Sequence, residues 1–427
     1  MNPIVIATIV LLVALFMKVP VFISVMAGSM SYFMLASGVP AQIFSQRVSS
    51  GMESITLLAV PFFVAAGVFM NYSGVTKRVM DFCSVMTGRM SGGLAQVNIL
   101  LSTLMGGLSG SALADAAMEA NMLCPEMEKK GFSKEFASVV TATSSMITPL
   151  IPPGIAMILY GSIANVSIGK LFVSGIGVGF LLCSAMMILV SRISKKRGYV
   201  PLRSQPLPKG EFAGVLKKAA LPLCLPIIII GGIRLGIFTP TEAGSIAILY
   251  ALLLGFIYRE LNVGSFWQGV KETVITTASI MLIVGAASSF AWVLTRERIP
   301  QKLTELIVQV IANKYLFLLV VNIFLLFVGM FIEGNAAMIV LVPLLAPIAT
   351  AYGIDEIQFA MIFIFNMAIG SLSPPMGTLM FVTCGVTKCK IKSFIREAVP
   401  FYIMLVICLL LLTFVPFVST GLVSLVY

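Results

Sequence analysis

The chain has 427 residues, of which 59% are hydrophobic and 11% are charged, and its net charge is +11. Soluble domains carry roughly 25% charged residues, so these charges are too few to coat a water-exposed surface and the composition predicts a polytopic membrane protein. The lack of histidine excludes His-based catalysis and His-ligated metal, and the seven scattered cysteines include no Cys-x-x-Cys pair. We assign the excess of Lys and Arg to cytoplasmic loops and not to nucleic-acid binding.

Apolar stretches of the length that a bilayer crossing requires, about 20 residues, recur in both halves of the chain. Spanning helices are expected over residues 4–17, 20–37, 54–72, 133–165 and 169–191, and over residues 214–235, 240–259, 270–294, 355–386 and 395–424. The first stretch has no basic segment before it and no small-residue cleavage site after it, so we interpret it as a spanning helix and not as a removed signal. The expected fold class is an all-α polytopic membrane protein.

Two further apolar segments, residues 92–130 and 316–352, are broken in the middle by small and polar residues, GGLSGS at 106–111 and EGN at 333–335. Each segment could form two spans, or a re-entrant hairpin that enters and leaves on the same side. Hairpins give five crossings per half, and with the N-terminus outside they place seven of the 28 Lys and Arg residues outside and 21 inside. This bias toward the inside favours hairpins. The residues expected outside are Arg47, Lys170, Arg234, Arg296, Arg298, Lys302 and Lys314.

The two halves of the sequence match at one constant offset in residue number. Single Gly and Pro matches mean little in membrane helices, but one offset shared over this distance is hard to obtain by chance. Because each half has an odd number of crossings, we expect an inverted repeat, which is common in secondary transporters. The matched pairs are Gly107 and Gly329, Pro125 and Pro347, Gly131 and Gly353, Pro152-Pro153 and Pro374-Pro375, Lys170 and Lys392, and Phe172 and Phe394.

These patterns divide the chain into two inverted repeats, residues 1–191 and 219–427, joined by a basic cytoplasmic linker at 192–218. Two segments mix charged and apolar residues at helical spacing, which predicts amphipathic arms at the membrane interface, although ordinary loop helices would look similar. The first repeat is divided into scaffold helices 1–72, an arm 75–89, a hairpin 92–130, an interrupted helix 133–165 and a helix 169–191. The second is divided into scaffold helices 219–294, an arm 299–314, a hairpin 316–352, an interrupted helix 355–386 and a helix 395–424.

Four places inside the expected membrane region break helical order, at residues 106–111, 144–154, 333–335 and 371–378. Proline removes an N–H donor from a helix, and broken backbone at membrane depth must face protein, ions or a watery cavity. Carbonyls and hydroxyls suit a small cation, and the N-terminus of a half-helix suits an anion. A single serine here is more simply explained by helix packing. Four clusters in matching positions predict a site for two small cations and one anionic substrate.

Acidic residues at membrane depth are candidate ion ligands or proton carriers. Asp115 and Glu119 lie one helical turn apart on the first hairpin, although Asp115 could equally stabilise the start of a helix. Glu333 precedes the second break and has the same two interpretations, whereas Glu242 follows Pro240 and is expected to be structural. The sequence contains no P-loop, which argues against direct ATP drive, and no suitable Asp pair for an intramembrane protease.

Three motifs in combination resemble the large membrane subunit of tripartite ATP-independent periplasmic (TRAP) transporters, the DctM-like family. They are residues 107–115 (GLSGSALAD), the proline pairs at 152–153 and 374–375, and residues 239–243 (TPTEA). The resemblance covers essentially the whole chain, and within the family the sequence is most similar to the large subunits of bacterial sialic-acid systems. Gly154 stands where the family often has Ser, so a hydroxyl contact is not assumed there.

The resemblance implies an elevator-type fold of the ion-transporter superfamily in the bacterial inner membrane, with both termini periplasmic by the topology above. It implies two partners, a small four-helix membrane subunit and a soluble periplasmic substrate-binding protein. Sodium ions would drive uptake of a carboxylate, with sialic acid (N-acetylneuraminate) as the leading substrate and no other cofactor. The positions matching the first sodium site are Ser109, Ser111, Ser144, Ser145, Thr148 and Pro149. Those matching the second are Gly334, Asn335, Ser371, Ser373 and Thr378. The substrate is expected near Ser109, Ser111, Ser144 and Asp115.

Three other interpretations remain open from the sequence. A standalone sodium- or proton-coupled dicarboxylate carrier would have the same architecture but would transport without a binding protein. A membrane enzyme would need a catalytic pair at depth, which the missing histidine and the lone Asp115 argue against. A channel fits less well, because broken helices from both halves favour an occluded central site.

Overall fold

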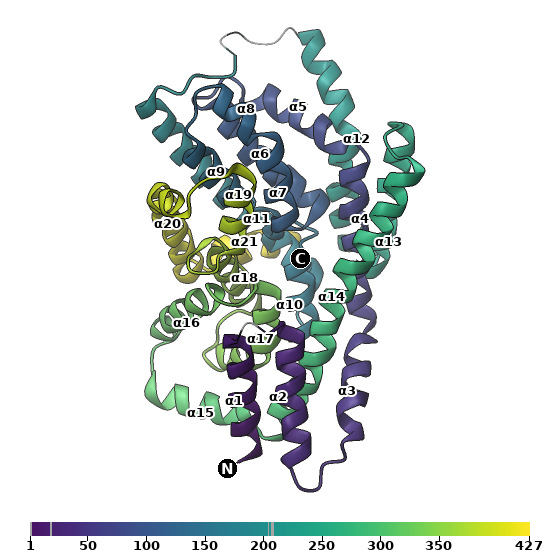
Figure 1. The fold of residues 1–427 in the computed structure, drawn as a ribbon, viewed down its shortest axis with the longest axis vertical. Coiled ribbons are helices and arrows are strands. Elements are labelled where there is room, and N and C mark those ends of the chain that lie inside the picture. Colours follow the sequence, from purple (N-terminus) through teal and green to yellow (C-terminus); the bar gives the residue numbers. More distant parts are fainter. Residues whose placement is uncertain (1, 18, 204, 206–208) are drawn as a thin grey trace.

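The structure, a computed structural model, describes residues 2–17, 19–203, 205 and 209–427. Among these residues every regular element is a helix and no strand occurs (Figure 1). The helices of the first half are α1 (Pro3–Phe16), α2 (Val21–Leu35), α3 (Gln42–Met52), α4 (Ala59–Tyr72), α5 (Val75–Thr87), α6 (Gly93–Ser109), α7 (Ala112–Met122), α8 (Cys124–Lys129), α9 (Lys134–Ser144), α10 (Ile155–Ala164) and α11 (Ile168–Arg197), with 3₁₀ turns at Ile55–Leu58 and Thr148–Leu150.

The second half contains a comparable but not identical series of helices. It contains α12 (Lys209–Arg234), α13 (Pro240–Ile257), α14 (Val263–Arg296), α15 (Ile299–Val310), α16 (Lys314–Gly329), α17 (Gly334–Ala351), α18 (Glu356–Leu372), α19 (Thr378–Thr387), α20 (Ile391–Phe414) and α21 (Phe417–Val426). Helix starts recur at the offset seen in the sequence. α7 begins at Ala112 and α17 at Gly334, while α9 begins at Lys134 and α18 at Glu356, so both pairs of starts are separated by that same offset. Both expected hairpins and both interrupted helices therefore occur as helix–break–helix units.

Some expected spans differ in extent from the helices. The span expected at 54–72 is the second part of a longer unit, in which α3 and α4 meet at a bend of 56°. The helix expected at 395–424 is divided, because Pro416 has no N–H to continue the ladder of α20 and the chain restarts as α21. Two helices are longer than the expected spans. α11 continues past residue 191 to Arg197, and α14 begins at Val263, before residue 270.

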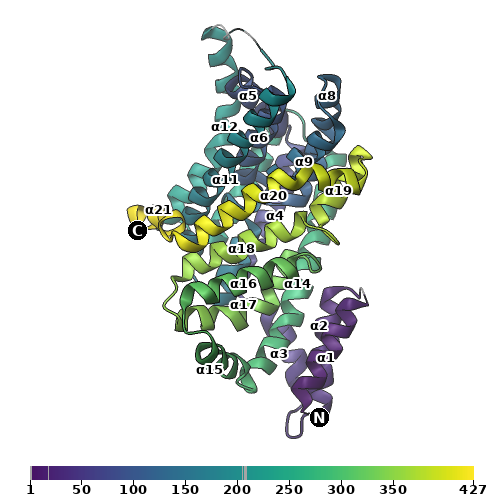
Figure 2. The same cartoon turned by 90° about the vertical axis from the view of Figure 1, so that its left-hand side faces the viewer.

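Two layers of helices lie side by side, as Figures 1 and 2 show from two directions. The scaffold layer contains α1–α4 and α12–α14, with α14 packed against α2, α3 and α4, and α13 packed against α4. The hairpin layer contains α6–α11 and α16–α21. Within the described part of the chain, six helices are long and apolar enough to cross a membrane, or up to eight if each bent pair is one span. The chain is therefore a multi-pass helical membrane protein.

Each broken apolar segment folds as a hairpin whose two ends meet. In the first hairpin, Gly93 at the start of α6 packs against the linker, and Phe132 beyond the end of α8 contacts Tyr199 of the same linker with ring centroids 4.3 Å apart. In the second, Phe317 in the first turn of α16 stacks on Tyr352, which ends α17, at 4.6 Å. The two ends of the first segment therefore both contact the linker, and the two ends of the second contact each other. Re-entrant topology in the membrane stays a prediction.

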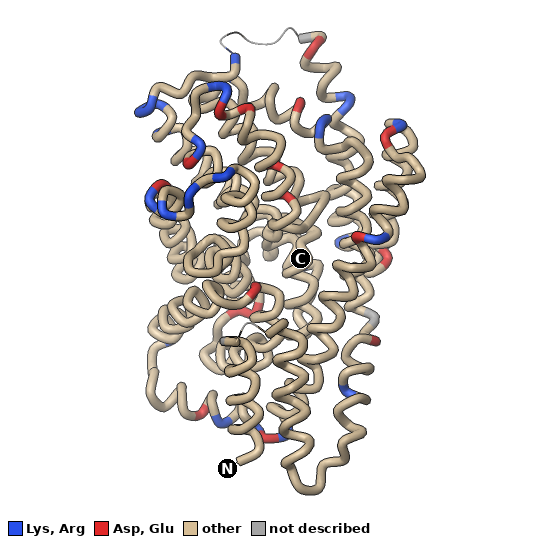
Figure 3. The backbone as a smooth tube through the Cα atoms, viewed as in Figure 1, with Lys and Arg blue, Asp and Glu red and all other residues tan. Residues whose placement is uncertain are grey.

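Basic residues gather at the end of the molecule where the linker lies (Figure 3). Three helix ends meet there. Arg197 of α11 pairs with Glu397 of α20 at 2.7 Å, and its guanidinium lies over the ring of Phe136 of α9 at 5.4 Å. All three ends carry Lys or Arg residues that the sequence places inside, so the packing agrees with one basic face.

Glycine contacts allow the second hairpin to approach the second interrupted helix closely. Gly329, the last residue of α16, faces Gly370 near the end of α18, and a Cβ added to Gly370 would lie 2.5 Å from the backbone of Gly329. Real Cβ atoms do not come this close, so any side chain at Gly370 would force the two helices apart. Small residues commonly permit this kind of helix contact in membranes.

Replacing Gly370 by Ala is expected to lower the thermal unfolding midpoint of the purified chain, because overpacking typically costs about 1–3 kcal/mol. The matched control is Gly385→Ala in α19, where an added Cβ meets no atom within 4 Å. This control should leave the midpoint unchanged or slightly raised, since Ala favours a helix over Gly. Equal midpoints for the two variants would contradict the close contact.

Candidate functional site

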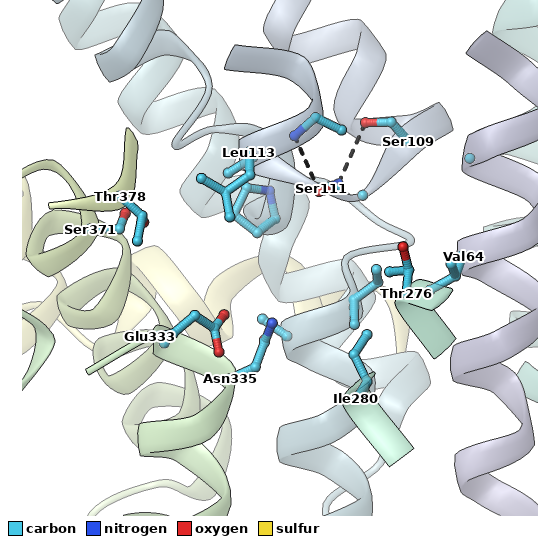
Figure 4. Close-up of a pocket in the computed structure, with 18 of the residues that line it drawn as sticks. Val64, Ser109, Ser111, Leu113, Thr276, Ile280, Glu333, Asn335, Ser371 and Thr378 are labelled. Atoms are coloured by element: carbon cyan, nitrogen blue, oxygen red, sulfur yellow. Dashed lines mark hydrogen bonds between the residues drawn. The ribbon is translucent and has the colours of Figure 1, made fainter. Parts of the chain in front are cut away.

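A cavity of about 470 Å³ lies between the scaffold layer and the hairpin layer (Figure 4). Its wall is built from both hairpin tips, both interrupted helices and the scaffold helices α4 and α14. This volume falls within the range of roughly 300–1,000 Å³ that is typical of small-molecule sites. The site residues predicted from the sequence that line it are Ser109, Ser111, Pro149, Gly334, Asn335, Ser371 and Thr378.

The first tip is a tight turn between α6 and α7. Gly110 has φ +63°, in the left-handed region that favours glycine, and a Cβ there would lie 2.6 Å from the carbonyl oxygen of Pro153. From the scaffold side, a Cβ on Gly67 of α4 would lie 2.6 Å from the carbonyl oxygen of Ser109. Ser111 caps α7, since its Oγ accepts a hydrogen bond from a first-turn N–H at 3.4 Å. The tip therefore touches both the interrupted helix and the scaffold.

Asp115 joins the first tip to the first interrupted helix. Its carboxylate is fully buried and accepts hydrogen bonds from Ser109 Oγ at 2.8 Å and from Thr148 Oγ1 at 2.7 Å. It does not cap α7, and it lies behind the cavity wall, away from the position expected for a substrate ligand. Glu119 is also fully buried, with Ser102 Oγ 2.8 Å from one of its oxygens. Among the described residues, neither acid forms an ion pair.

Ser144 and Ser145, predicted for the first sodium site, lie in a buried polar network behind the wall. Ser144 Oγ donates to Asn98 Oδ1 at 2.7 Å, and Asn98 Nδ2 donates to Thr141 Oγ1 at 2.8 Å. Ser145 Oγ donates to the carbonyl oxygen of Thr141 at 2.7 Å. The sequence analysis did not identify Asn98 or Thr141. For Asn98, the available signal was a polar side chain within an apolar hairpin helix; Thr141 lies in α9, before the break of the interrupted helix.

The second tip presents a carboxylate and an amide. Glu333 caps α17, with Oε2 accepting a hydrogen bond from the N–H of Ala336 at 3.0 Å. Gly334 and Asn335 follow on the cavity wall, and Figure 4 shows Glu333 and Asn335 across the space from Ser111. Glu333 therefore has the structural role of a helix cap and is also exposed to the cavity.

The second interrupted helix contributes residues on both sides of its break. Ser371 near the end of α18 and Thr378 at the start of α19 line the cavity. Ser373 instead is buried behind the wall and donates to a carbonyl oxygen one turn earlier at 2.9 Å. Only some of the residues predicted for each sodium site therefore line the cavity. The remaining residues are buried behind the cavity wall.

The scaffold supplies polar wall residues that the sequence analysis missed. Asn71 of α4 and three residues of α14, Glu272, Thr276 and Ser279, line the cavity. The three α14 positions follow the i, i+4, i+7 spacing of one helix face, which was the signal available in an otherwise apolar span. Glu272 accepts a hydrogen bond from the hydroxyl of Tyr72 at 3.1 Å.

The wall therefore offers hydroxyls, amides, carbonyls and two helix N-termini, which suit binding of an ion or a polar solute. Among the described residues no group of three His, Cys, Asp or Glu side chains could hold a metal ion. The family model described as the DctM component of the tripartite ATP-independent periplasmic transporter matches residues 8–418. The chain belongs to the DctM family. This DctM-family chain is a transporter permease subunit and not an enzyme.

Relatives of this DctM-family chain differ in the substrate that they are named for. It is 40% identical over 403 residues to the sialic acid TRAP transporter large permease protein SiaM of Vibrio cholerae, covering 94% of each chain. It is 36% identical over 377 residues to the C4-dicarboxylate TRAP transporter large permease protein DctM of Pseudomonas aeruginosa, covering 87% of this chain and 86% of that one. Among solved structures, the YdaH transporter of Alcanivorax borkumensis has the same fold, with a TM-score of 0.60, 14% identity, and coverage of 91% and 90% of the two chains.

The bridge through Asp115 should contribute to stability. Thr148→Val removes the hydroxyl that donates to Asp115 Oδ2, and an unsatisfied buried acceptor costs about 1–3 kcal/mol. We expect a lower thermal unfolding midpoint for this variant. Thr350→Val is the control, because the exposed Thr350 hydroxyl bonds only to a carbonyl of its own helix. A loss of the same size in both variants would show that the bridge contributes nothing specific.

Proposed function

We propose that this DctM-family permease moves a carboxylate substrate across the bacterial inner membrane together with sodium ions, and that N-acetylneuraminate is the leading substrate. The observation that carries the proposal is the shared cavity, which both hairpin tips and both interrupted helices reach. Interrupted helices at membrane depth provide backbone groups and helix ends that can replace the hydration of an ion or a charged solute.

Sodium would bind at two sets of oxygen atoms, one in each half. In the first half, Ser109, Ser111 and Pro149 are on the wall, and Ser144, Ser145 and Thr148 lie behind them. The second set has Gly334, Asn335, Ser371 and Thr378 on the wall, with Ser373 behind. Hydroxyl and carbonyl oxygens at each break are the support for this assignment, because hard cations prefer oxygen ligands.

The substrate carboxylate would lie between the tips, near Ser109 and Ser111. The N-terminus of α7 starts next to Ser111 and brings the positive end of a helix dipole to that part of the cavity. Asp115 and Ser144 would act from behind, by holding the tip and the interrupted helix in place. The relative named for sialic acid, at 40% identity, supports N-acetylneuraminate as the first substrate to test.

Transport would follow an elevator mechanism, in which the hairpin layer moves against the scaffold layer. Among the described residues, no hydrogen bond or ion pair joins α4 or α14 to either tip. The facing scaffold surface includes the apolar residues Val64, Val68, Ile275, Ile280 and Ile283. The absence of such bonds at the tips would let the tips move along α4 and α14. Elsewhere the layers are joined by a hydrogen bond from Arg234 of α12 to the carbonyl oxygen of Val426 in α21 at 3.1 Å, which this motion would break. The arms α5 and α15 would lie at the membrane interface.

Two partners would complete the transporter, a small four-helix membrane subunit and a soluble periplasmic substrate-binding protein. The family description, a component of a tripartite periplasmic transporter, supports this assembly. Scaffold helices α12 and α13 keep most of their apolar surface outside the protein interior, with 22% and 33% of their most apolar windows buried. They are available to lipid or to a membrane subunit. Both termini would be periplasmic.

A second candidate is a standalone carrier of C4-dicarboxylates coupled to sodium or protons. The observation that favours a C4-dicarboxylate substrate is the similarity to the C4-dicarboxylate TRAP transporter large permease protein DctM, at 36% identity. Transport without a binding protein is the alternative left open by the sequence. The two candidates differ in whether a binding protein is required and in the substrate.

Uptake of labelled N-acetylneuraminate into proteoliposomes under an inward sodium gradient tests the proposal. Uptake should need this chain, a small membrane subunit and a periplasmic binding protein from the same source, and it should disappear without sodium. Uptake of succinate by this chain alone would favour the standalone carrier and contradict the tripartite proposal.

Within that assay, the double substitution Ser109→Ala and Ser111→Ala should abolish uptake, since it removes two cavity hydroxyls from the first tip. Membrane insertion should be retained, whereas the thermal unfolding midpoint should fall, because Ser109 donates to Asp115 and Ser111 caps α7. Uptake is therefore compared at equal amounts of folded, inserted protein. The matched control is Ser45→Ala with Ser50→Ala, two exposed hydroxyls of α3 that bond only to their own helix. Full uptake by the tip variant would rule out the assignment of the first tip.

A further inference from the structure

The two ends of the cavity are related by the repeat but differ in chemistry. Glu333 occupies the position of the second half that is equivalent to Ser111 in the first, and each caps the returning helix of its hairpin. The capped N–H groups, of Ala114 and Ala336, are equivalent by the same offset. One tip therefore presents a neutral hydroxyl where the equivalent position of the other presents a carboxylate.

No basic side chain balances this carboxylate on the wall. Glu333 and Glu272 are the charged residues among the described residues that line the cavity, and both are acidic. Glu272 is engaged by the hydroxyl of Tyr72 at 3.1 Å on the scaffold side. The hydrogen bond that Glu333 accepts comes from its own tip, from the N–H of Ala336 at 3.0 Å. A carboxylate has about four lone-pair positions, so Glu333 can accept further hydrogen bonds from a solute in the cavity.

We propose that Glu333 selects the substrate class, by accepting hydrogen bonds from hydroxyl or amide groups of a monocarboxylic acid and by repelling a second carboxylate. The inference rests on the proposed function, because it takes the substrate carboxylate to lie at the first tip. A polyhydroxylated acid then has its charge at the Ser111 end and its donors at the Glu333 end. A dicarboxylate would place its second charge against Glu333, where like charges disfavour binding.

Geometry supports the assignment of the two ends. Figure 4 shows Ser109 and Ser111 on one side of the cavity and Glu333 with Asn335 on the opposite side. The Glu333 side chain is only partly exposed, so water competes less for its acceptor positions than at an open surface. Hydrogen bonds to a charged acceptor are typically stronger than those between neutral groups.

Ligand-detected NMR on the full-length chain in nanodiscs with saturating sodium can measure dissociation constants for N-acetylneuraminate and succinate. The variant Glu333→Gln removes the charge and retains an oxygen that can cap α17. We expect it to weaken N-acetylneuraminate and to strengthen succinate, with a change in their affinity ratio of about 10- to 100-fold, the range for a hydrogen bond to a charged group. Glu333→Ser, which copies the equivalent residue of the first tip, should change the ratio in the same direction.

Glu272→Gln is the matched control, because it removes the same charge from another part of the wall. It should change the ratio by less than either Glu333 variant, because Glu272 lies on α14, away from both tips, and already accepts a hydrogen bond from the hydroxyl of Tyr72. An unchanged affinity ratio in both Glu333 variants would overturn the proposal. An equal shift of the ratio in Glu272→Gln would also overturn it, because the ratio would then depend on the net charge of the cavity and not on Glu333. A loss of sodium dependence with no change in ratio would make Glu333 a cation ligand and would also overturn it.

The same measurements separate this inference from the function on which it rests. Sodium-dependent binding of N-acetylneuraminate with an unchanged ratio contradicts the role of Glu333 alone. Failure of the wild-type chain to bind either acid in sodium would contradict the proposed function, and the role of Glu333 would be overturned with it.

Discussion

Backbone hydrogen bonding at membrane depth is the constraint on which the rest of the structure depends. Two hairpins and two helices are interrupted inside the protein, and each interruption leaves N–H and C=O groups without helical partners. Protein side chains replace those partners. Ser111 and Glu333 cap the returning helices, and Asp115 links the hydroxyls of Ser109 and Thr148. In the second half, the N–H of Met376 donates to the carbonyl oxygen of Met330 at 3.2 Å, so each hairpin is bonded to the interrupted helix of its own half. All four breaks line one cavity.

With all four breaks on its wall, one cavity would hold both the ions and the charged solute in the proposed function. In the proposed function, the same groups that leave the helical ladder would supply the oxygen ligands and helix ends of the site. The repeat provides the two halves with similar backbone geometry, but the side chains differ. Asp115 has an alanine, Ala337, at the equivalent position, and Ser111 has Glu333. A cavity with unlike ends suits a substrate with unlike ends, which is the basis for expecting a hydroxylated monocarboxylate.

The sequence predicts where the helices break, because Gly, Pro and polar residues interrupt otherwise apolar segments, and the structure has helix ends at those places. The inverted repeat stays a prediction. The sequence does not predict which side of each helix faces the cavity. Ser109 lines the cavity whereas Ser144 and Thr148 lie behind the wall, and only the packing of α6, α9 and α10 decides this. The scaffold wall was missed for a related reason. Glu272 and Thr276 belong to a span that, read alone, looks like an ordinary membrane helix.

The central claim is that both tips face one cavity that closes around sodium and substrate. Cross-linking tests it most directly, with Leu113→Cys and Met338→Cys introduced into a Cys224→Ser background that removes the exposed native thiol. Both residues line the cavity beside the tips, and neither is assigned to sodium or to the substrate. Bifunctional thiol reagents of graded length should join the two tips, and sodium with N-acetylneuraminate should suppress the reaction. Absence of a cross-link at every length, or a yield that sodium and N-acetylneuraminate leave unchanged, would contradict the account.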